Sequence, residues 1–190
     1  AEIKALGTSP DDNYRTFYEI FVYSFCDSDG DGIGDLKGVT SKLDYLTELG
    51  INGIWLMPVH PSTTYHKYNV SDYYGVDPSY GTMEDFEELM AACKERGIHV
   101  ILDLVLNHTS KEHPWFLEFK KARASGDTEN PYYDYYSCAT EEEKQGGVTY
   151  QKIAGSDYWY ECNFSGDMPE LNFDNPVVRE EVLKLGKYYL

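Results

Sequence analysis

The chain has 190 residues, which is enough for one domain, or one domain with an insertion, to bury a sizeable core. Its 33 acidic residues outnumber the 16 lysines and arginines, and the formal net charge is −17. A charge of this sign repels phosphate backbones and anionic membrane surfaces, so we expect neither nucleic acid nor a membrane as a partner. The sequence contains no apolar run of about 18 residues, so no transmembrane helix is predicted.

Aromatic residues make up 15% of the chain, and 18 residues are tyrosines. Tyrosine rings at a surface offer flat, amphipathic contacts for sugars. Packing in a core or a strand explains any single tyrosine equally well, so composition alone leaves both roles open.

The first part of the chain alternates strand and helix patterns. Residues 17–22 are aromatic and β-branched, which predicts a strand. Residues 38–49 carry a valine and leucines at helical spacing before a glycine, which predicts a helix. Residues 53–57 form a short apolar run that a proline stops, which predicts a second strand.

A second helix and a third strand follow. Thr82 and Asp85 have the spacing of a capping box, and a helix is predicted over residues 83–96 before a glycine. Residues 98–105 are almost wholly apolar around Asp103. That pattern is typical of a strand buried on both faces of a parallel sheet.

The alternation breaks at about residue 107. Residues 107–175 are polar and aromatic with no long helical period, and only residues 158–160 suggest a short strand. A helical pattern returns at Pro176 and continues to the last residue.

This order predicts an α/β fold with a parallel sheet and right-handed crossovers. A (β/α)8 TIM barrel needs about 250 residues, so the chain fits its first three βα units with an insertion after strand 3. We assign residues 1–106 to the barrel, 107–175 to the insertion and 176–190 to the third barrel helix, and expect the remainder of the barrel as a partner. A flavodoxin-like sheet is the alternative, but it rarely tolerates so large an insertion.

Residues 27–35 have the sequence DSDGDGIGD, in which acidic residues alternate with others. Their offsets match an EF-hand calcium loop, with a glycine at position 6 for the sharp turn. The predicted ligands are Asp27, Asp29, Asp31, the carbonyl of Ile33, and Asp35.

Two features separate this loop from an EF-hand. Position 12 is Gly38, where an EF-hand has a bidentate glutamate, and the preceding segment is a predicted strand. We therefore predict a calcium loop of another kind. A solvated acidic turn is the alternative, but it explains neither the alternation nor the glycine positions.

Polar residues also cluster where the second and third strands end. Asp103, Asn107 and His108 lie at the end of the third strand, and the C-terminal ends of barrel strands form the active face. Taken singly, Asp103 fits a structural ion pair and His108 a satisfied loop histidine; together the three residues favour a site. The loop 65–73 (YHKYNVSDY) reaches the same rim and suits a sugar ring, although an ordinary aromatic loop explains it as well.

Taken in order, these motifs resemble the α-amylase family of retaining α-glucoside hydrolases (glycoside hydrolase family 13). The resemblance runs from Thr16 to the end of the chain. The family fold is a (β/α)8 barrel with a domain B inserted after strand 3, in agreement with the break at residue 107. The matching stretches are YEIFVYSF, DSDGDGIGDLKGV, LDYLTELGINGIWLMPV, YHKYNVSDYYGVDPSYGTMEDF, GIHVILDLVLNHTS and MPELNFDNP.

The resemblance implies roles for five residues. Asp103 and His108 match the residues that hold the sugar at the subsite where cleavage occurs, and Tyr68 matches the tyrosine that stacks under that sugar. His66 matches a histidine found beside it in some members, and Asn107 an asparagine that supports domain B or a calcium ion.

Two further motifs bear on the site. The MPELN stretch matches the domain B signature, with Glu170 where an aspartate is usual. The methionine at its start resembles bacterial members intermediate between oligo-1,6-glucosidases and neopullulanases, so the specificity stays open. The acidic loop matches a calcium loop of bacterial members, which implies a structural Ca²⁺.

The family's nucleophile, acid/base and third essential carboxylate lie at strands four, five and seven and match no residue here. Because retaining hydrolysis needs two carboxyls about 5 Å apart, we expect these 190 residues alone to be inactive. We expect the parent protein to hydrolyse an α-glucan or oligosaccharide such as starch. An α-glucosyl transferase or isomerase, and a non-catalytic calcium- and sugar-binding module, are the alternatives.

Two expectations concern the environment of the protein. Cys138 and Cys162 share one tyrosine-rich segment, and the sequence leaves open whether they form a disulfide. The calcium loop and a polymeric substrate favour an extracellular or cell-surface location.

Overall fold

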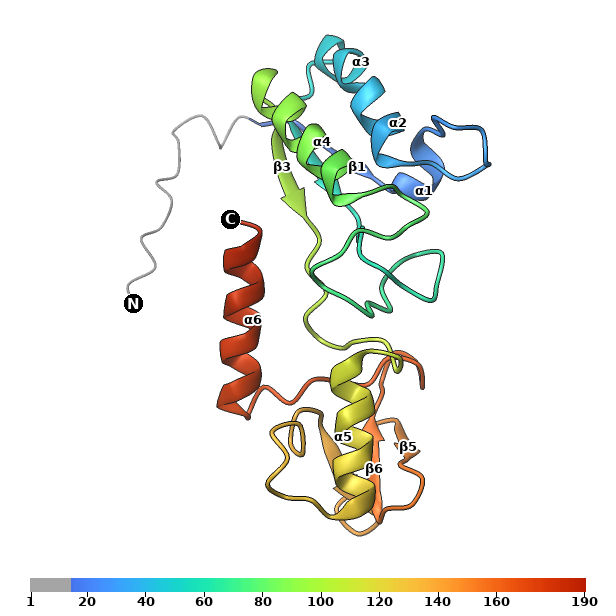
Figure 1. Ribbon diagram of the computed structural model, residues 1–190, viewed down its shortest axis with the longest axis vertical. Coiled ribbons are helices and arrows are strands. Elements are labelled where there is room, and N and C mark those ends of the chain that lie inside the picture. Colours follow the sequence, from blue (N-terminus) through green and yellow to red (C-terminus); the bar gives the residue numbers. More distant parts are fainter. Residues whose placement is uncertain (1–14) are drawn as a thin grey trace. The chain divides into compact units, whose positions relative to one another are not determined.

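The computed structural model describes residues 15–190 (Figure 1). It divides into two compact units, of which the first contains residues 15–59 with residues 78–103. The second contains residues 60–77 with 104–190. No helix in the described part of the chain is both long and apolar enough to cross a membrane. The domain boundaries predicted at residues 106 and 175 remain a prediction.

The first unit contains a three-stranded parallel sheet with strand order β1-β2-β3. The strands are β1 (Phe17–Ile20), β2 (Gly53–Leu56) and β3 (His99–Leu102). The helices are α1 (Val22–Phe25), α2 (Leu36–Ser41), α3 (Leu43–Glu48) and α4 (Met83–Glu95), and α2 packs against α4. The three predicted strands and the predicted helix at residues 83–96 are thus confirmed, with shorter strands.

The first predicted helix and the first predicted strand need correction. The helix expected over residues 38–49 is two helices, because the chain tightens at Lys42, whose N–H donates to the carbonyl of Val39 at 3.0 Å. It also starts earlier than predicted, since Asp35 caps α2. The first strand ends at Ile20, and Val22 already belongs to α1.

The prediction that the third strand is buried on both faces is wrong. The register aligns Glu19, Trp55 and Ile101 across the sheet, and all three are exposed, Ile101 to 47%. The neighbouring row buries Ile20 and Leu56. The described residues of the first unit therefore do not bury this row of the sheet. In a (β/α)8 barrel, the inward face of each strand is covered by side chains of the other strands.

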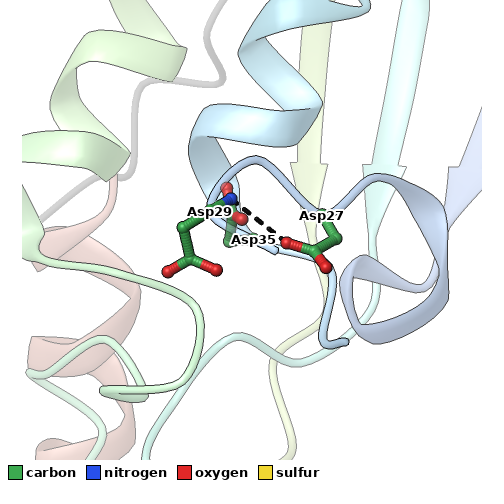
Figure 2. A group of neighbouring side chains, drawn as sticks. All are labelled: Asp27, Asp29 and Asp35. Atoms are coloured by element: carbon green, nitrogen blue, oxygen red, sulfur yellow. Dashed lines mark hydrogen bonds between the residues drawn. The ribbon is translucent and has the colours of Figure 1, made fainter. Parts of the chain in front are cut away.

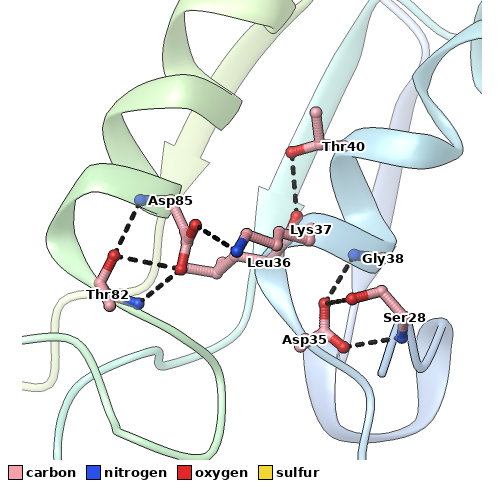
Figure 3. A network of polar contacts seen from close by, with 8 residues as sticks. All are labelled: Ser28, Asp35, Leu36, Lys37, Gly38, Thr40, Thr82 and Asp85. Carbon is pink, nitrogen blue, oxygen red and sulfur yellow. Dashed lines mark hydrogen bonds and ion pairs between the residues drawn. The ribbon is translucent and has the colours of Figure 1, made fainter. Parts of the chain in front are cut away.

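Polar contacts at the N-termini of α2 and α4 include an ion pair that connects the two helices (Figure 3). The Thr82 hydroxyl accepts the N–H of Asp85 at 3.2 Å, and Asp85 accepts the N–H of Thr82 at 2.9 Å, so the predicted capping box is present. The other oxygen of Asp85 pairs with Lys37 at 3.3 Å. The Asp35 side chain accepts the N–H of Gly38 at 2.7 Å. The same carboxylate that caps α4 thus also contacts α2.

The second unit contains a small antiparallel sheet with strand order β4-β6-β5. Its strands are β4 (Cys138–Thr140), β5 (Tyr150–Lys152) and β6 (Tyr158–Glu161), and its helices are α5 (Pro114–Ser125) and α6 (Pro176–Tyr188). The strand expected at residues 158–160 and the helix from Pro176 are confirmed. The main core is aromatic and contains Phe116, Phe119, Tyr135, Tyr136, Tyr160 and Leu171.

The prediction of no long helix between residues 107 and 175 is wrong, because α5 has 12 residues. Its buried side chains include Arg123, so its apolar stripe is weak. The signals that define it lie at its ends: His113 accepts the N–H of Trp115, Pro114 is the first helical residue, and Gly126 adopts a left-handed φ of 69°.

All four cysteines are free, so no disulfide joins Cys138 to Cys162. Cys138 pairs with Tyr160 across the sheet, which makes Cys162 its diagonal neighbour. Diagonal neighbours lie about 7–8 Å apart, beyond the usual Cα spacing of a disulfide. Burial raises the pKa of the Cys138 thiol to about 11, which keeps it protonated.

The capping box yields a stability prediction. Thr82→Ala removes the side-chain acceptor for the Asp85 N–H, and we expect it to lower the free energy of unfolding by about 1 kcal/mol. Thr47→Ala is the matched control, because its hydroxyl only donates back to Leu43 within α3. Urea denaturation of the two variants checks this; equal midpoints would contradict it.

The buried His113 yields a prediction about acid stability. It is 4% exposed, and burial lowers its pKa to about 4, against about 6.5 in an unfolded chain. The unfolded state therefore takes up this proton first, so the stability that His113 provides above pH 6.5 is lost as the pH falls towards 4.

The matched variant is His113→Asn, because asparagine keeps an N-cap acceptor but does not titrate. Between pH 7.5 and 4.5 we expect the variant to lose roughly 2–3 kcal/mol less unfolding free energy than the wild type. Some acid sensitivity remains in the variant, since burial also lowers the pKa of His60 and His108. Urea titrations at both pH values measure the difference, and equal losses would exclude this role of His113.

Candidate functional site

The acidic loop brings three carboxylates together. Asp27, Asp29 and Asp35 each have one oxygen within 4.8 Å of the others (Figure 2). The N–H groups of Gly30 and Gly32 donate to Asp27 at 2.6 and 2.9 Å. Both glycines have φ near +90°, a conformation that residues with a Cβ rarely adopt. The glycine positions therefore shape the loop around the Asp27 carboxylate.

Hydrogen bonds hold two of these carboxylates, Asp27 and Asp35, in their charged form. The N–H groups of Gly30 and Gly32 lower the pKa of Asp27. Burial raises the pKa of Asp35, but hydrogen bonds from Ser28 and Gly38 outweigh it, so the pKa of Asp35 is lowered overall. Asp27 and Asp35 thus remain anionic at neutral pH.

The other predicted ligands lie in the same loop. Asp31 is not in the three-carboxylate group; its side chain accepts the N–H of Ile33 at 2.7 Å. Carboxylate and carbonyl oxygens are hard donors, which suit Ca²⁺ or Mg²⁺ rather than a soft transition metal. The donor set therefore fits the predicted ion.

Four of the five predicted sugar-binding residues meet in the second unit. His66 Nδ1 accepts the N–H of Tyr68 at 3.1 Å, and His108 Nε2 lies 3.1 Å from the Tyr68 carbonyl. The Asn107 amide nitrogen lies 3.3 Å from His108 Nδ1. The backbone of Tyr68 is thus held on both sides by histidines, one of them 40 residues away in sequence.

These contacts define the proton positions on His108. A carbonyl only accepts, so Nε2 carries the hydrogen that it donates to Tyr68, and Nδ1 accepts from the Asn107 amide. Burial lowers the pKa of His108, so the ring is neutral at pH 7. The site therefore presents an uncharged, hydrogen-bonding imidazole.

The domain B signature supports this segment. Leu171 donates its N–H to the carbonyl of Asn107 at 3.0 Å, Thr109 donates to the carbonyl of Pro169 at 3.2 Å, and His108 pairs with Glu170 in an antiparallel bridge. The two sequence motifs are therefore adjacent in the structure.

Phe164 is a residue that the sequence analysis missed. Its ring is 72% exposed, and its centroid lies 5.3 Å from that of His108. Phe164 thus adds an exposed aromatic ring beside the His108 imidazole. The sequence feature that could have indicated Phe164 is a single aromatic residue within the polar stretch Asn-Phe-Ser-Gly at residues 163–166.

Asp103 belongs to the first unit. It is half-buried and follows β3 directly, rather than lying within the strand, and its N–H donates to the carbonyl of Leu56 at 3.0 Å. Asp103 thus lies at the C-terminal end of its strand, as the sequence predicted.

A family model described as the catalytic domain of alpha amylase matches residues 19–190. The chain belongs to the α-amylase family. "Alpha-amylase 3" of Dictyoglomus thermophilum is 51% identical over 175 residues, which cover 92% of this chain and 34% of that protein.

Solved structures of the α-amylase family agree with this assignment. Eubacterium rectale Amy13B is 48% identical with a TM-score of 0.86, covering 93% of this chain and 35% of that one. A crystal structure of the trehalulose synthase MutB is 40% identical with a TM-score of 0.86, covering 95% and 34%. The predicted fold class, a partial (β/α)8 barrel, is confirmed. The chain spans about a third of the length of these relatives.

Proposed function

We propose that the protein carrying this α-amylase-family chain cleaves α-glucosidic bonds in an α-glucan or oligosaccharide, with retention of configuration. The observation that carries the proposal is the contact of His108 with the Tyr68 backbone, within a family match over residues 19–190. In this role the Tyr68 ring stacks under the sugar, and the neutral His108 bonds a hydroxyl. Asp103 and His66 take the sugar-binding roles of the family residues that they match.

The chemical step needs two carboxyls about 5 Å apart, one as nucleophile and one as acid/base. No residue of this chain matches the family's catalytic carboxylates. The 190 residues therefore contribute binding and orientation of the sugar, and we expect bond cleavage only when they are joined to the rest of a barrel.

A second candidate is α-glucosyl transfer or isomerisation. It is favoured by the similarity to MutB, which is named a trehalulose synthase. A non-catalytic calcium- and sugar-binding module is the third candidate.

An activity assay on the complete protein decides among these functions. Chromatography of products from starch, maltotriose, isomaltose and sucrose distinguishes hydrolysis of 1,4- or 1,6-bonds from transfer, and the 190-residue chain alone should give none. Sugar binding without turnover by the complete protein would favour the non-catalytic module. The matched variants are Tyr68→Ala and Tyr45→Ala, the latter altering an exposed tyrosine of α3.

We expect Tyr68→Ala to lower kcat/KM by roughly fivefold or more, because a stacked ring contributes about 1 kcal/mol or more to the transition state. Tyr45→Ala should match the wild type. Turnover by the chain alone, or an undiminished kcat/KM in Tyr68→Ala, would contradict the proposed roles.

We further propose that the acidic loop holds a structural Ca²⁺. Asp27, Asp29 and Asp35 would supply carboxylate oxygens, with Asp31 and the Ile33 carbonyl completing the set. A bound ion would offset the repulsion among these charges and hold the loop that precedes α2, without a part in the reaction. The proposed location, outside the cell or on its surface, follows from this ion and a polymeric substrate.

Chelation tests the calcium proposal. Because a ligand that binds only the folded state stabilises it by about 2.7 kcal/mol at 100 times its Kd, we expect EGTA to lower the Tm by several degrees and Ca²⁺ to restore it. Asp29→Asn keeps an acceptor for the Asp31 N–H but loses a charge, so its Tm should respond less. Asp127→Asn, at an exposed site after α5, is the control. A wild-type Tm that changes with neither EGTA nor Ca²⁺ would contradict the proposal of a bound calcium ion.

A further inference from the structure

Lys67 has an unusual backbone. Among residues 15–190 it is the one residue other than glycine with a left-handed φ, at 65°. A side chain with a Cβ is disfavoured in this conformation, which persists only where surrounding contacts enforce it. Glycine would adopt the same φ without that cost, so the lysine side chain must provide something that glycine cannot.

The side chain provides a buried cation. Lys67 Nζ lies 2.8 Å from Asp77 Oδ2, and both side chains are only 8% exposed. Surface ion pairs contribute little, but a buried pair has a defined geometry, and loss of either partner leaves an uncompensated charge.

Asp77 holds the loop at a second point. The oxygen that pairs with Lys67 also accepts the N–H of Ser62 at 3.2 Å. Ser62 in turn forms an antiparallel bridge with Val70. One carboxylate therefore fastens both the start and the tip of the loop formed by residues 62–70.

Tyr68 directly follows Lys67 in the chain. Its N–H donates to His66 and its carbonyl accepts from His108, so its backbone has a fixed place between two rings. The buried ammonium directs Lys67 into the protein, while the half-buried Tyr68 packs against the core cluster that contains Val70 and Tyr73.

We propose that Lys67 and Asp77 are positioning residues for sugar binding. Their ion pair holds the left-handed turn that presents the Tyr68 ring to the substrate. The substrate part of this inference rests on the proposed function; the loop-holding part stands on the geometry alone.

Four variants of the complete protein separate positioning from stability. Lys67→Met and Asp77→Asn each remove one charge of the buried ion pair, whereas Lys67→Met/Asp77→Asn removes both and keeps an acceptor for the Ser62 N–H. Lys67→Gly relieves the backbone at φ 65° but removes the whole buried side chain, so its comparison with Lys67→Met separates the left-handed turn from the ion pair. Lys121→Met is the matched control, because it breaks an exposed ion pair with Glu118 on α5.

Two readouts are measured well below the Tm. Steady-state kinetics on maltotriose, or on the substrate that the product assay identifies, gives KM and kcat. Hydrogen exchange followed by mass spectrometry gives protection of peptides that cover residues 62–70. A purely stabilising pair would alter the Tm but neither KM nor local protection of the folded protein.

We expect KM to rise at least fivefold in Lys67→Met, Lys67→Gly and the double variant, with faster exchange in residues 62–70. The double variant should recover most of the Tm lost in the single variants without recovering KM. Lys121→Met should match the wild type in all three measurements. If Lys67→Met or Asp77→Asn does not fold, KM and hydrogen exchange in the double variant and in Lys67→Gly still test the inference.

Three results would overturn the inference. One is unchanged exchange in residues 62–70, another is a double variant with wild-type KM, and the third is an equal effect of Lys121→Met. A wild-type protein without turnover of any α-glucoside would instead reject the proposed function. In that case the exchange data alone decide whether the ion pair holds the loop.

Discussion

The buried hydroxyl of Tyr73 is the contact on which the position of the His108 segment depends. It donates to the carbonyls of Val105 and His108 at 2.6 and 3.1 Å, and its ring packs with Val70 and Leu185. Burial raises the pKa of this phenol, so it stays a neutral donor. Because carbonyls inside a protein need a donor, one hydroxyl holds the bend that carries His108 and ties it to the loop of Tyr73 itself.

The acidic loop and the segment around Tyr68 differ in their charge. In the acidic loop, backbone N–H groups keep Asp27 and Asp35 ionised in an open setting, which suits a hard cation. Around Tyr68, burial keeps His108 neutral, and the ion pair of Lys67 is compensated internally. A sugar has hydroxyls and C–H faces but no charge, so the hydrogen-bonding and aromatic groups around Tyr68 suit it. The most acidic motif is therefore structural in this interpretation, and the less conspicuous one binds the substrate.

Local signals in the sequence predicted the fold where they act over a few residues. The capping box of Thr82 and Asp85 needs only neighbouring residues, and the structure contains it as predicted. Helix α5 escaped prediction because its amphipathic stripe is weak, although its proline and glycine ends are clear. The burial of β3 was overestimated because an apolar composition does not say which face of a strand a neighbour covers; Ile101 is exposed.

The sequence by itself determined the spacing of the acidic loop, the alternation of strands and helices, and a motif order specific enough to indicate the family. These are properties of residues close together in the chain. Only the tertiary structure decided that Asp29 joins the carboxylate group while Asp31 does not, and that His108 meets Tyr68. It alone revealed the burial of Lys67 against Asp77. These contacts join residues that are distant in the sequence, so they depend on the path of the folded chain. The fold and its burial determine which side chains meet, which nitrogen of His108 carries the proton and which charges are paired.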